Sequence, residues 1–249
     1  MKQAQVSLWI IIGVLMVLGV LVIVTQKQRI QDDTWIAANQ DNSGTQLKAQ
    51  RILDSCFEKA VKESVETHSY FGGLKPKQGS YALHLSSDLD NFPSFEKFMG
   101  TLSDEIKGRL TQCKFLIVQG SPGWLITSQY PTVALSASGS STRASLNMPL
   151  RLKKGEQSVT ISKSDYMITV PMEIIYTFLV EVHKSQKANY PLRDLVFLLD
   201  LTKKYNASFT FILDESENVV QHNFIFKDYT FNNQEYYTVY SVKYPKVKE

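Results

Sequence analysis

The chain has 249 residues, of which 43 % are hydrophobic, and its formal net charge at neutral pH is +3. The basic residues are scattered and the charge is mild, so the composition does not point to nucleic acid as a partner. Tyr, Phe, Ser and Thr are frequent beyond the N-terminal region, which is typical of a globular protein with much β-sheet.

An uncharged segment, VSLWIIIGVLMVLGVLVIVT, runs from Val6 to Thr25. A helix rises about 1.5 Å per residue, so this segment matches the roughly 30 Å hydrocarbon core of a bilayer. It predicts a single transmembrane helix within residues 1–27 and makes the lipid bilayer an expected partner. The apolar side chains expected to lie in lipid include Val6, Trp9, Ile12, Leu15, Leu18, Leu21 and Val24.

This segment has two other interpretations. A cleaved secretory signal has a shorter apolar region of about 7–15 residues and a small-residue cleavage site, whereas Gln26-Lys27-Gln28-Arg29 follows here. An uncleaved anchor is therefore favoured. A pilin-type signal stays open, because Ala4-Gln5 resembles the cut site of archaeal pilin precursors, although Gln3 stands where Lys or Arg is usual.

The flanking charges decide the expected orientation only weakly. Lys2 precedes the segment and Lys27 and Arg29 follow it, so the positive-inside count is nearly tied. A short N-terminal tail is easily retained inside, and a pair of cysteines suits an oxidising exterior. We expect a single-pass protein of the cell membrane whose large C-terminal domain is extracellular.

The next part of the chain reads as a polar stalk and two helices. Residues 28–45 form the predicted stalk, and residues 46–249 form the predicted domain. Apolar residues at helical spacing predict a helix over Gln46–Tyr70, which the pair Gly72-Gly73 ends. After a loop with one strand over Ser80–Leu85, a second helix is predicted over Ser94–Cys113.

From Lys114 onward the apolar pattern changes to a period of two. Lys114–Gln119 and Trp124–Gln129 read as a hairpin, and the alternation continues to Val170 as an antiparallel meander. Helices are predicted after Pro171 and Pro191, with a sub-boundary near residue 170, before β-structure returns. The last strands are predicted over Ser208–Leu213, Val219–Phe226 and Glu235–Tyr244. The fold class is therefore α+β, with helices packed on an antiparallel meander.

Several stretches resemble uncharacterised membrane-anchored proteins of small-genome (DPANN-type) archaea. They are QVSLWIIIGV near the start, RILDSCFEKAVKESV followed by Gly72-Gly73, the strand SLNMPLRL, and the helix end Asp104–Cys113 followed by Phe115. The resemblance covers most of the chain, but its motifs are architectural. It implies an archaeal envelope protein and carries no activity, cofactor or catalytic residue with it.

Cys56 and Cys113 are the only cysteines, and each lies on the apolar stripe of a predicted helix. Two buried thiols would fit, because Cys packs as a small hydrophobe. A disulfide between the two helices is favoured. A zinc site is not expected, because the two cysteines have no suitably spaced histidines.

No motif for catalysis, metal binding or a cofactor stands out, and no such residues are predicted. The four histidines share no spacing and read as packed or surface residues: His68, His84, His183 and His222. Ser94 and Lys97 match S-x-x-K, the start of a serine acyl enzyme, but the accompanying motifs are missing. Ser94 is better explained as a helix N-cap.

Two further features concern the surface. Tyr236, Tyr240 and Tyr244 fall on one face of the last strand and could form a recognition surface, although a half-buried strand explains them as well. Asn206-Ala207-Ser208 is a glycosylation sequon that matters only outside the cell.

These observations favour a non-enzymatic, membrane-anchored surface protein that binds a partner, self-associates or supports the envelope. One alternative is a pilin-like filament subunit whose apolar helix packs in a fibre core. Another is an enzyme whose site is assembled from dispersed residues that show no motif.

Overall fold

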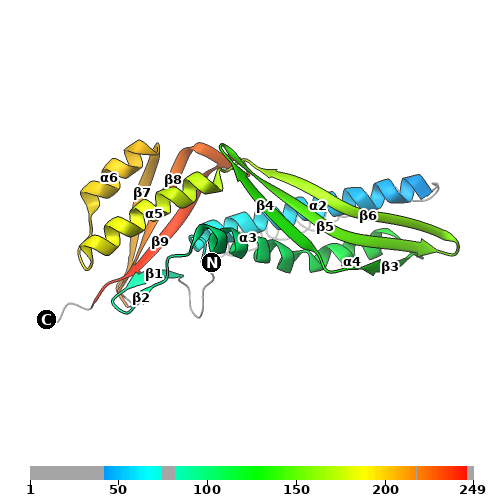
Figure 1. The fold of residues 1–249 in the computed structure, drawn as a ribbon, viewed down its shortest axis with the longest axis horizontal. Coiled ribbons are helices and arrows are strands. Elements are labelled where there is room, and N and C mark those ends of the chain that lie inside the picture. The colour runs from blue at the N-terminus through cyan, green and yellow to red at the C-terminus, as the bar shows by residue number, and fades with distance from the viewer. Residues whose placement is uncertain (1–41, 75–81, 217, 246–249) are drawn as a thin grey trace, which may run out of the picture. The chain divides into compact units, whose positions relative to one another are not determined.

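The computed structural model describes residues 42–74, 82–216 and 218–245 (Figure 1). It is an α+β structure, as predicted. The chain divides into two compact units, residues 1–48 and 49–249, and the arrangement below concerns the second. The predicted anchor, Val6–Thr25, lies outside the described residues. Among the described residues, no helix is long and apolar enough to cross a membrane.

The helices and strands follow one another in a mixed order along the chain. They are α2 (Asn42–Tyr70), β1 (Leu83–Ser86), β2 (Leu89–Asp90), α3 (Phe95–Arg109), α4 (Thr111–Gly120), β3 (Leu125–Ser128), β4 (Thr132–Ser138), β5 (Ser141–Lys154), β6 (Gln157–Ile168), α5 (Met172–Asn189), α6 (Leu195–Lys204), β7 (Ala207–Asp214), β8 (Val219–Phe231) and β9 (Gln234–Lys243).

The first sheet is antiparallel and is built around β5. Strand β6 pairs along one edge of β5, while β4 and β3 pair in succession along the other. Buried and exposed residues alternate along β5, so one of its faces is apolar. Helices α2, α3 and α4 run beside this sheet (Figure 1), and the Ser103 hydroxyl of α3 donates to the Val133 carbonyl of β4 at 2.9 Å.

The second sheet has five strands in the order β2-β1-β9-β8-β7. Its pairs are antiparallel except that β1 runs parallel to β9, so the whole is not a simple meander. Helix α5 packs on this sheet through Phe178. Its ring lies edge-on to the rings of Phe224 and Phe226, with centroid distances of 4.8 and 5.0 Å. The strand β7 lies at one end of this sheet.

The predicted hairpin over Lys114–Gln129 is wrong in its first half. Residues 111–120 form helix α4, in which Cys113 and Ile117 are buried one turn apart. A short apolar run fits either period, and burial of this i, i+4 pair decides for a helix. The predicted helix Ser94–Cys113 is correspondingly divided at Leu110, where α3 ends and α4 begins.

Other predicted details hold. Ser94 is the N-cap of α3, and its hydroxyl accepts a hydrogen bond from the Lys97 backbone N–H at 3.3 Å. Helix α2 ends at Tyr70, and the turn after it contains Gly72 and Gly73, which have φ values of +57° and +82°. Such left-handed angles favour glycine because it has no Cβ.

Candidate interaction surface

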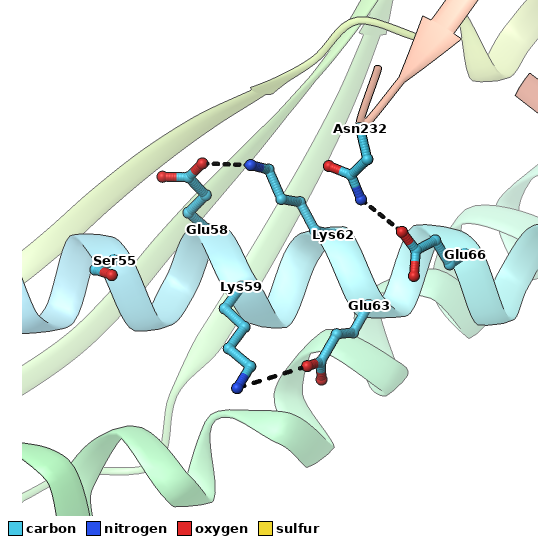
Figure 2. A pocket seen from close by; sticks show the side chains of 7 residues that line it. All are labelled: Ser55, Glu58, Lys59, Lys62, Glu63, Glu66 and Asn232. Atoms are coloured by element: carbon cyan, nitrogen blue, oxygen red, sulfur yellow. Dashed lines mark hydrogen bonds and ion pairs between the residues drawn. The ribbon is translucent and has the colours of Figure 1, made fainter. Parts of the chain in front are cut away.

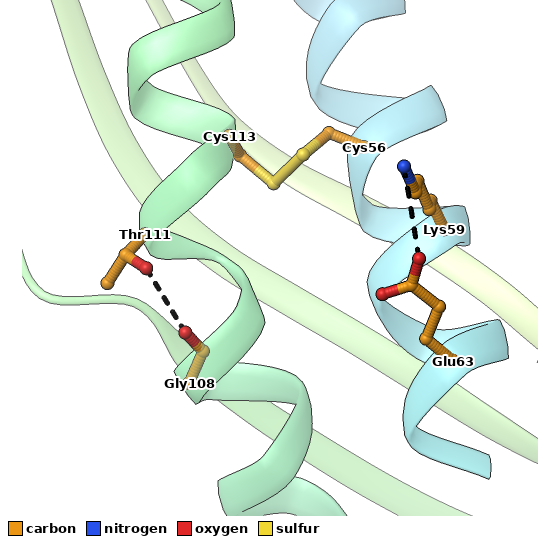
Figure 3. The surroundings of a disulfide bond; sticks show 6 residues. All are labelled: Cys56, Lys59, Glu63, Gly108, Thr111 and Cys113. Carbon is orange, nitrogen blue, oxygen red and sulfur yellow. Dashed lines mark hydrogen bonds and ion pairs between the residues drawn. A yellow bond between two sulfur atoms is a disulfide. The ribbon is translucent and has the colours of Figure 1, made fainter. Parts of the chain in front are cut away.

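The disulfide between Cys56 and Cys113 is present, as predicted (Figure 3). It joins α2 to α4 with 5.6 Å between the two Cα atoms, and the residues are 57 positions apart in sequence. Cys113 is completely buried and Cys56 is half-buried. The bond ties α2 to α4, although β1, β2 and α3 lie between them in sequence.

The predicted tyrosine recognition surface is wrong for two of its three members. Tyr240 is completely buried and Tyr236 is 3 % exposed, because β9 is an inner strand whose residues contact α5 and α2. Tyr244 is half-buried, and its hydroxyl donates to the Gln186 side chain at 3.1 Å. The common face of these tyrosines therefore belongs to the core and not to an exterior site.

Asn206 lies in the exposed turn before β7, with φ +45°. Its side-chain amide donates to the Asp228 carboxylate at 2.7 Å. The sequon is on the surface, but its amide nitrogen already has a hydrogen-bond partner in the fold.

The structure brings three of the four histidines around Tyr240, which spacing along the sequence did not reveal. The ring centroids of His84, His183 and His222 lie 4.7, 6.0 and 6.3 Å from that of Tyr240. They come from β1, α5 and β8 respectively. Only the pairing of β1 and β8 with opposite edges of β9, together with the packing of α5, makes them neighbours.

A hydrogen-bonded chain passes through this cluster from the core to the surface. The Tyr240 hydroxyl lies 2.8 Å from Nδ1 of His183, whose Nε2 lies 3.0 Å from an Asp90 oxygen. Lys187 pairs with the other oxygen of Asp90 and holds the pKa of that carboxyl below its usual value. Because Asp90 accepts a hydrogen bond from Nε2, the neutral His183 accepts a hydrogen bond from the Tyr240 hydroxyl at Nδ1.

This series of hydrogen bonds is poorly suited to catalysis. Burial raises the pKa of Tyr240, so its phenol keeps its proton, and the residue has no exposed surface from which to meet a substrate. Burial likewise lowers the pKa of His183, despite its contact with Asp90. Within the described ranges, no group of three or more His, Cys, Asp or Glu residues could hold a metal ion.

A shallow depression of about 300 Å³ lies along α2 (Figure 2). Its charged side chains pair with one another: Glu58 with Lys62 at 2.6 Å, and Lys59 with Glu63 at 3.8 Å. Glu66 accepts a hydrogen bond from Asn232. Ligand sites are usually enclosed and largely apolar, and this charged, internally paired surface has neither property.

The outer strand β7 and the neighbouring helix α6 leave a different kind of surface uncovered. We call it the β7–α6 surface. Its members are large apolar residues that expose between 41 % and 73 % of their area: Leu192, Leu195, Val196, Leu199, Phe211, Ile212 and Leu213. Figure 1 shows α6 beside β7, and the two elements are in contact.

Helix α6 is apolar on two sides. Leu198 and Leu201 are buried against the domain. Leu195, Val196 and Leu199, one turn apart, form a second stripe that faces outward with Leu192. The charged residues of the helix, Asp200, Lys203 and Lys204, lie in its second half, so the exposed apolar stripe in its first half is the part that another molecule would cover.

The backbone of β7 is also open on one side. It pairs with β8, and in the described part of the chain no strand pairs with its other edge. Residues 207–213 carry no charge. The outer strand β6 of the first sheet, by contrast, carries Lys163 and Asp165, the kind of charge that protects an edge from pairing.

A second exposed apolar group lies at α4 and β3: Phe115, Leu116, Val118 and Leu125. Here the strand is only four residues long, and the charged residues Lys153 and Arg151 of β5 pair with Leu125 and Thr127. The β7–α6 surface is therefore the stronger candidate for an interaction site, since it combines apolar side chains with an open backbone edge.

Comparison with protein-family models, with curated proteins and with solved structures finds no match to this chain. The resemblance to archaeal membrane-anchored proteins stays a prediction.

Proposed function

We propose that this chain is a non-enzymatic, membrane-anchored surface protein that acts by binding another protein through the β7–α6 surface. The observation that carries this function is the coincidence of an uncharged open strand with an outward apolar stripe on the adjacent helix. Open edges are normally short or charged, so a long uncharged edge is a binding feature or an aggregation hazard.

Two features support the membrane and exterior parts of the proposal. The apolar run Val6–Thr25 is long enough to span a bilayer. The Cys56–Cys113 disulfide suits a domain that matures in an oxidising compartment. The buried Tyr240 cluster supports a non-enzymatic role, since its groups serve packing and hydrogen bonding in the core.

The location is tested by labelling intact cells that produce the full chain. Thr160 is exposed on β6, so Thr160→Cys supplies a thiol in addition to the paired native cysteines. A membrane-impermeant maleimide should label this variant in intact cells, and the protein should stay with membranes after alkaline extraction. Labelling only after lysis, or release into the soluble fraction, would overturn the proposed location.

The binding role is tested by a photo-activatable residue in place of Val196, with the same residue at Thr160 as the matched control. Illumination should produce a protein adduct from position 196 and not from position 160. The absence of any adduct at position 196 in membranes would count against the proposed function.

A further inference from the structure

We infer that the occupant of the β7–α6 surface is a second copy of this chain, joined by antiparallel pairing of β7 with the β7 of its partner. This inference rests on the proposed function and names the partner for the same surface. The contact would join the two five-stranded sheets into one continuous sheet across a two-fold axis.

The strand is compatible with itself for a geometrical reason. Two identical strands that run antiparallel are related by a two-fold axis, so every backbone donor that one copy offers meets the matching acceptor of the other. The uncharged stretch from Ala207 to Leu213 brings no like charges face to face across such a pair. Strand β6 would place Lys163 and Asp165 in the equivalent contact.

The same two-fold axis covers the outer stripe of α6. A rotation axis perpendicular to the sheet keeps both copies of α6 on the same face, beside the joined edge. The apolar stripes around Val196 and Leu199 would then meet each other across the axis. A single dimer interface would thus cover both the open edge of β7 and the outer apolar stripe of α6.

The charges at the ends of β7 also fit an antiparallel pair. Lys203 precedes the strand and Glu215 follows it, whereas the neighbouring Lys204 pairs with Glu181 at 2.9 Å and Asp214 accepts a hydrogen bond from the Ser216 hydroxyl. Antiparallel pairing places the acidic end of each copy near the basic end of the other. Lys203 already contacts Asp200 at 3.6 Å, but both side chains are more than two-thirds exposed, so this weak pair leaves the lysine able to reorient.

The exposed area is sufficient for a specific dimer. The seven apolar residues expose 41–73 % of their surfaces, which amounts to roughly 600 Å² per copy. Because successive residues of a strand face opposite sides of the sheet, Ile212 lies on the other face from Phe211 and Leu213, and the dimer would bury roughly 1,000 Å² with the backbone and polar atoms of the joined edge included. Specific interfaces begin at about this size.

Cysteine cross-linking of the full chain in membranes tests the inference. Thr210 is exposed near the middle of β7, and Thr160 is exposed on the charged outer strand β6. Mild oxidation should link Thr210→Cys into a covalent dimer and leave Thr160→Cys monomeric. Adding Val196→Lys to the Thr210→Cys variant should reduce the dimer fraction roughly tenfold, because it buries a charge in the contact.

Each other result has a definite meaning. Equal cross-linking at both positions would indicate random collision in the membrane and would overturn the dimer. If position 210 gives no dimer while the photo-activatable residue at position 196 links to a different protein, self-pairing is wrong but the proposed binding function stands. If neither position gives any adduct, both are overturned.

Discussion

Nε2 of His84 lies 3.1 Å from the carbonyl oxygen of Gly72, and this contact holds the end of α2 against β1. Nδ1 of the same ring accepts a hydrogen bond from the Ser241 backbone N–H at 3.1 Å. Because Nδ1 accepts, Nε2 carries the proton and donates to Gly72. Burial lowers the pKa of His84 to about 4, in keeping with a neutral ring.

The closeness of this contact makes Gly72 irreplaceable. A Cβ at this position would lie 1.9 Å from the Val239 carbonyl oxygen and 2.7 Å from Nε2 of His84. We expect Gly72→Ala to lower the free energy of unfolding by about 3 kcal/mol or more, from steric conflict added to the left-handed backbone. Denaturant unfolding would measure this loss.

Gly155→Ala is the matched control for that substitution. Gly155 has φ +58°, almost the same as Gly72, but a Cβ added there would meet no atom within 4 Å. Gly155→Ala should therefore lower the free energy of unfolding by only about 1 kcal/mol, the cost of a left-handed backbone at alanine. If the two variants lose the same free energy of unfolding, the close approach of Gly72 to Val239 and His84 does not affect stability.

Stability should decline as the pH falls below 6.5. Burial lowers the pKa of His68 to about 3, and those of His84 and His222 to about 4. Between pH 6.5 and 4 the unfolded chain binds protons at these histidines and the folded chain does not. Each such proton removes about 1.4 kcal/mol of unfolding free energy per pH unit. Urea midpoints measured from pH 7.5 to 5 would show this slope.

A single substitution separates the contribution of His68. Neither ring nitrogen of His68 has a hydrogen-bond partner among the described residues, and the ring packs edge-on against Phe98 at 4.4 Å. His68→Leu should reduce the pH dependence by one proton, or about 1.4 kcal/mol per pH unit. A slope unchanged from that of the parent chain would contradict the assignment.

Loss of the Cys56–Cys113 disulfide should be costly. The bond closes a long loop, with a sequence separation of 57, which corresponds to about 4 kcal/mol on the chain-entropy model. The double substitution of both cysteines by alanine should lower the unfolding midpoint, and a reductant should have no further effect on that variant. If reduction leaves the midpoint of the parent chain unchanged, the disulfide does not stabilise the fold.

Removal of the Tyr240 hydroxyl should destabilise the core. Tyr240→Phe leaves Nδ1 of the buried His183 without its donor at 2.8 Å, an expected loss of roughly 1–2 kcal/mol. Tyr237→Phe, on the exposed side of the same strand, is the control and should change stability by less than about 0.5 kcal/mol. The two losses would be equal if the hydrogen bond contributed nothing.

Local pattern was sufficient for some elements and misleading for others. The end of α2 at Gly72-Gly73, the cap at Ser94 and the Cys56–Cys113 bond were all predicted, because each depends on near neighbours or on the only two cysteines present. The interval Lys114–Gln119 was predicted as a strand and is helical. A run so short has no distinct period, and only its contacts decide.

The exposure of the candidate surface was not predictable in the same way. Residues 208–213 were correctly predicted as a strand. The sequence of an apolar strand does not show whether the strand lies at the centre or at the edge of its sheet. The Tyr240 cluster was not predictable for a related reason, since His84, His183 and Tyr240 are far apart along the chain. Their meeting depends on strand order.

The amino-acid sequence by itself determined the apolar N-terminal segment, the α+β class and the covalent link, because period, length and residue type act locally. Tertiary structure alone decided which apolar residues became core and which stayed outside. That choice depends on the order of strands in the second sheet, which among the described residues leaves β7 with one neighbouring strand and α6 with one covered side. Burial belongs to the assembled fold and not to any one segment.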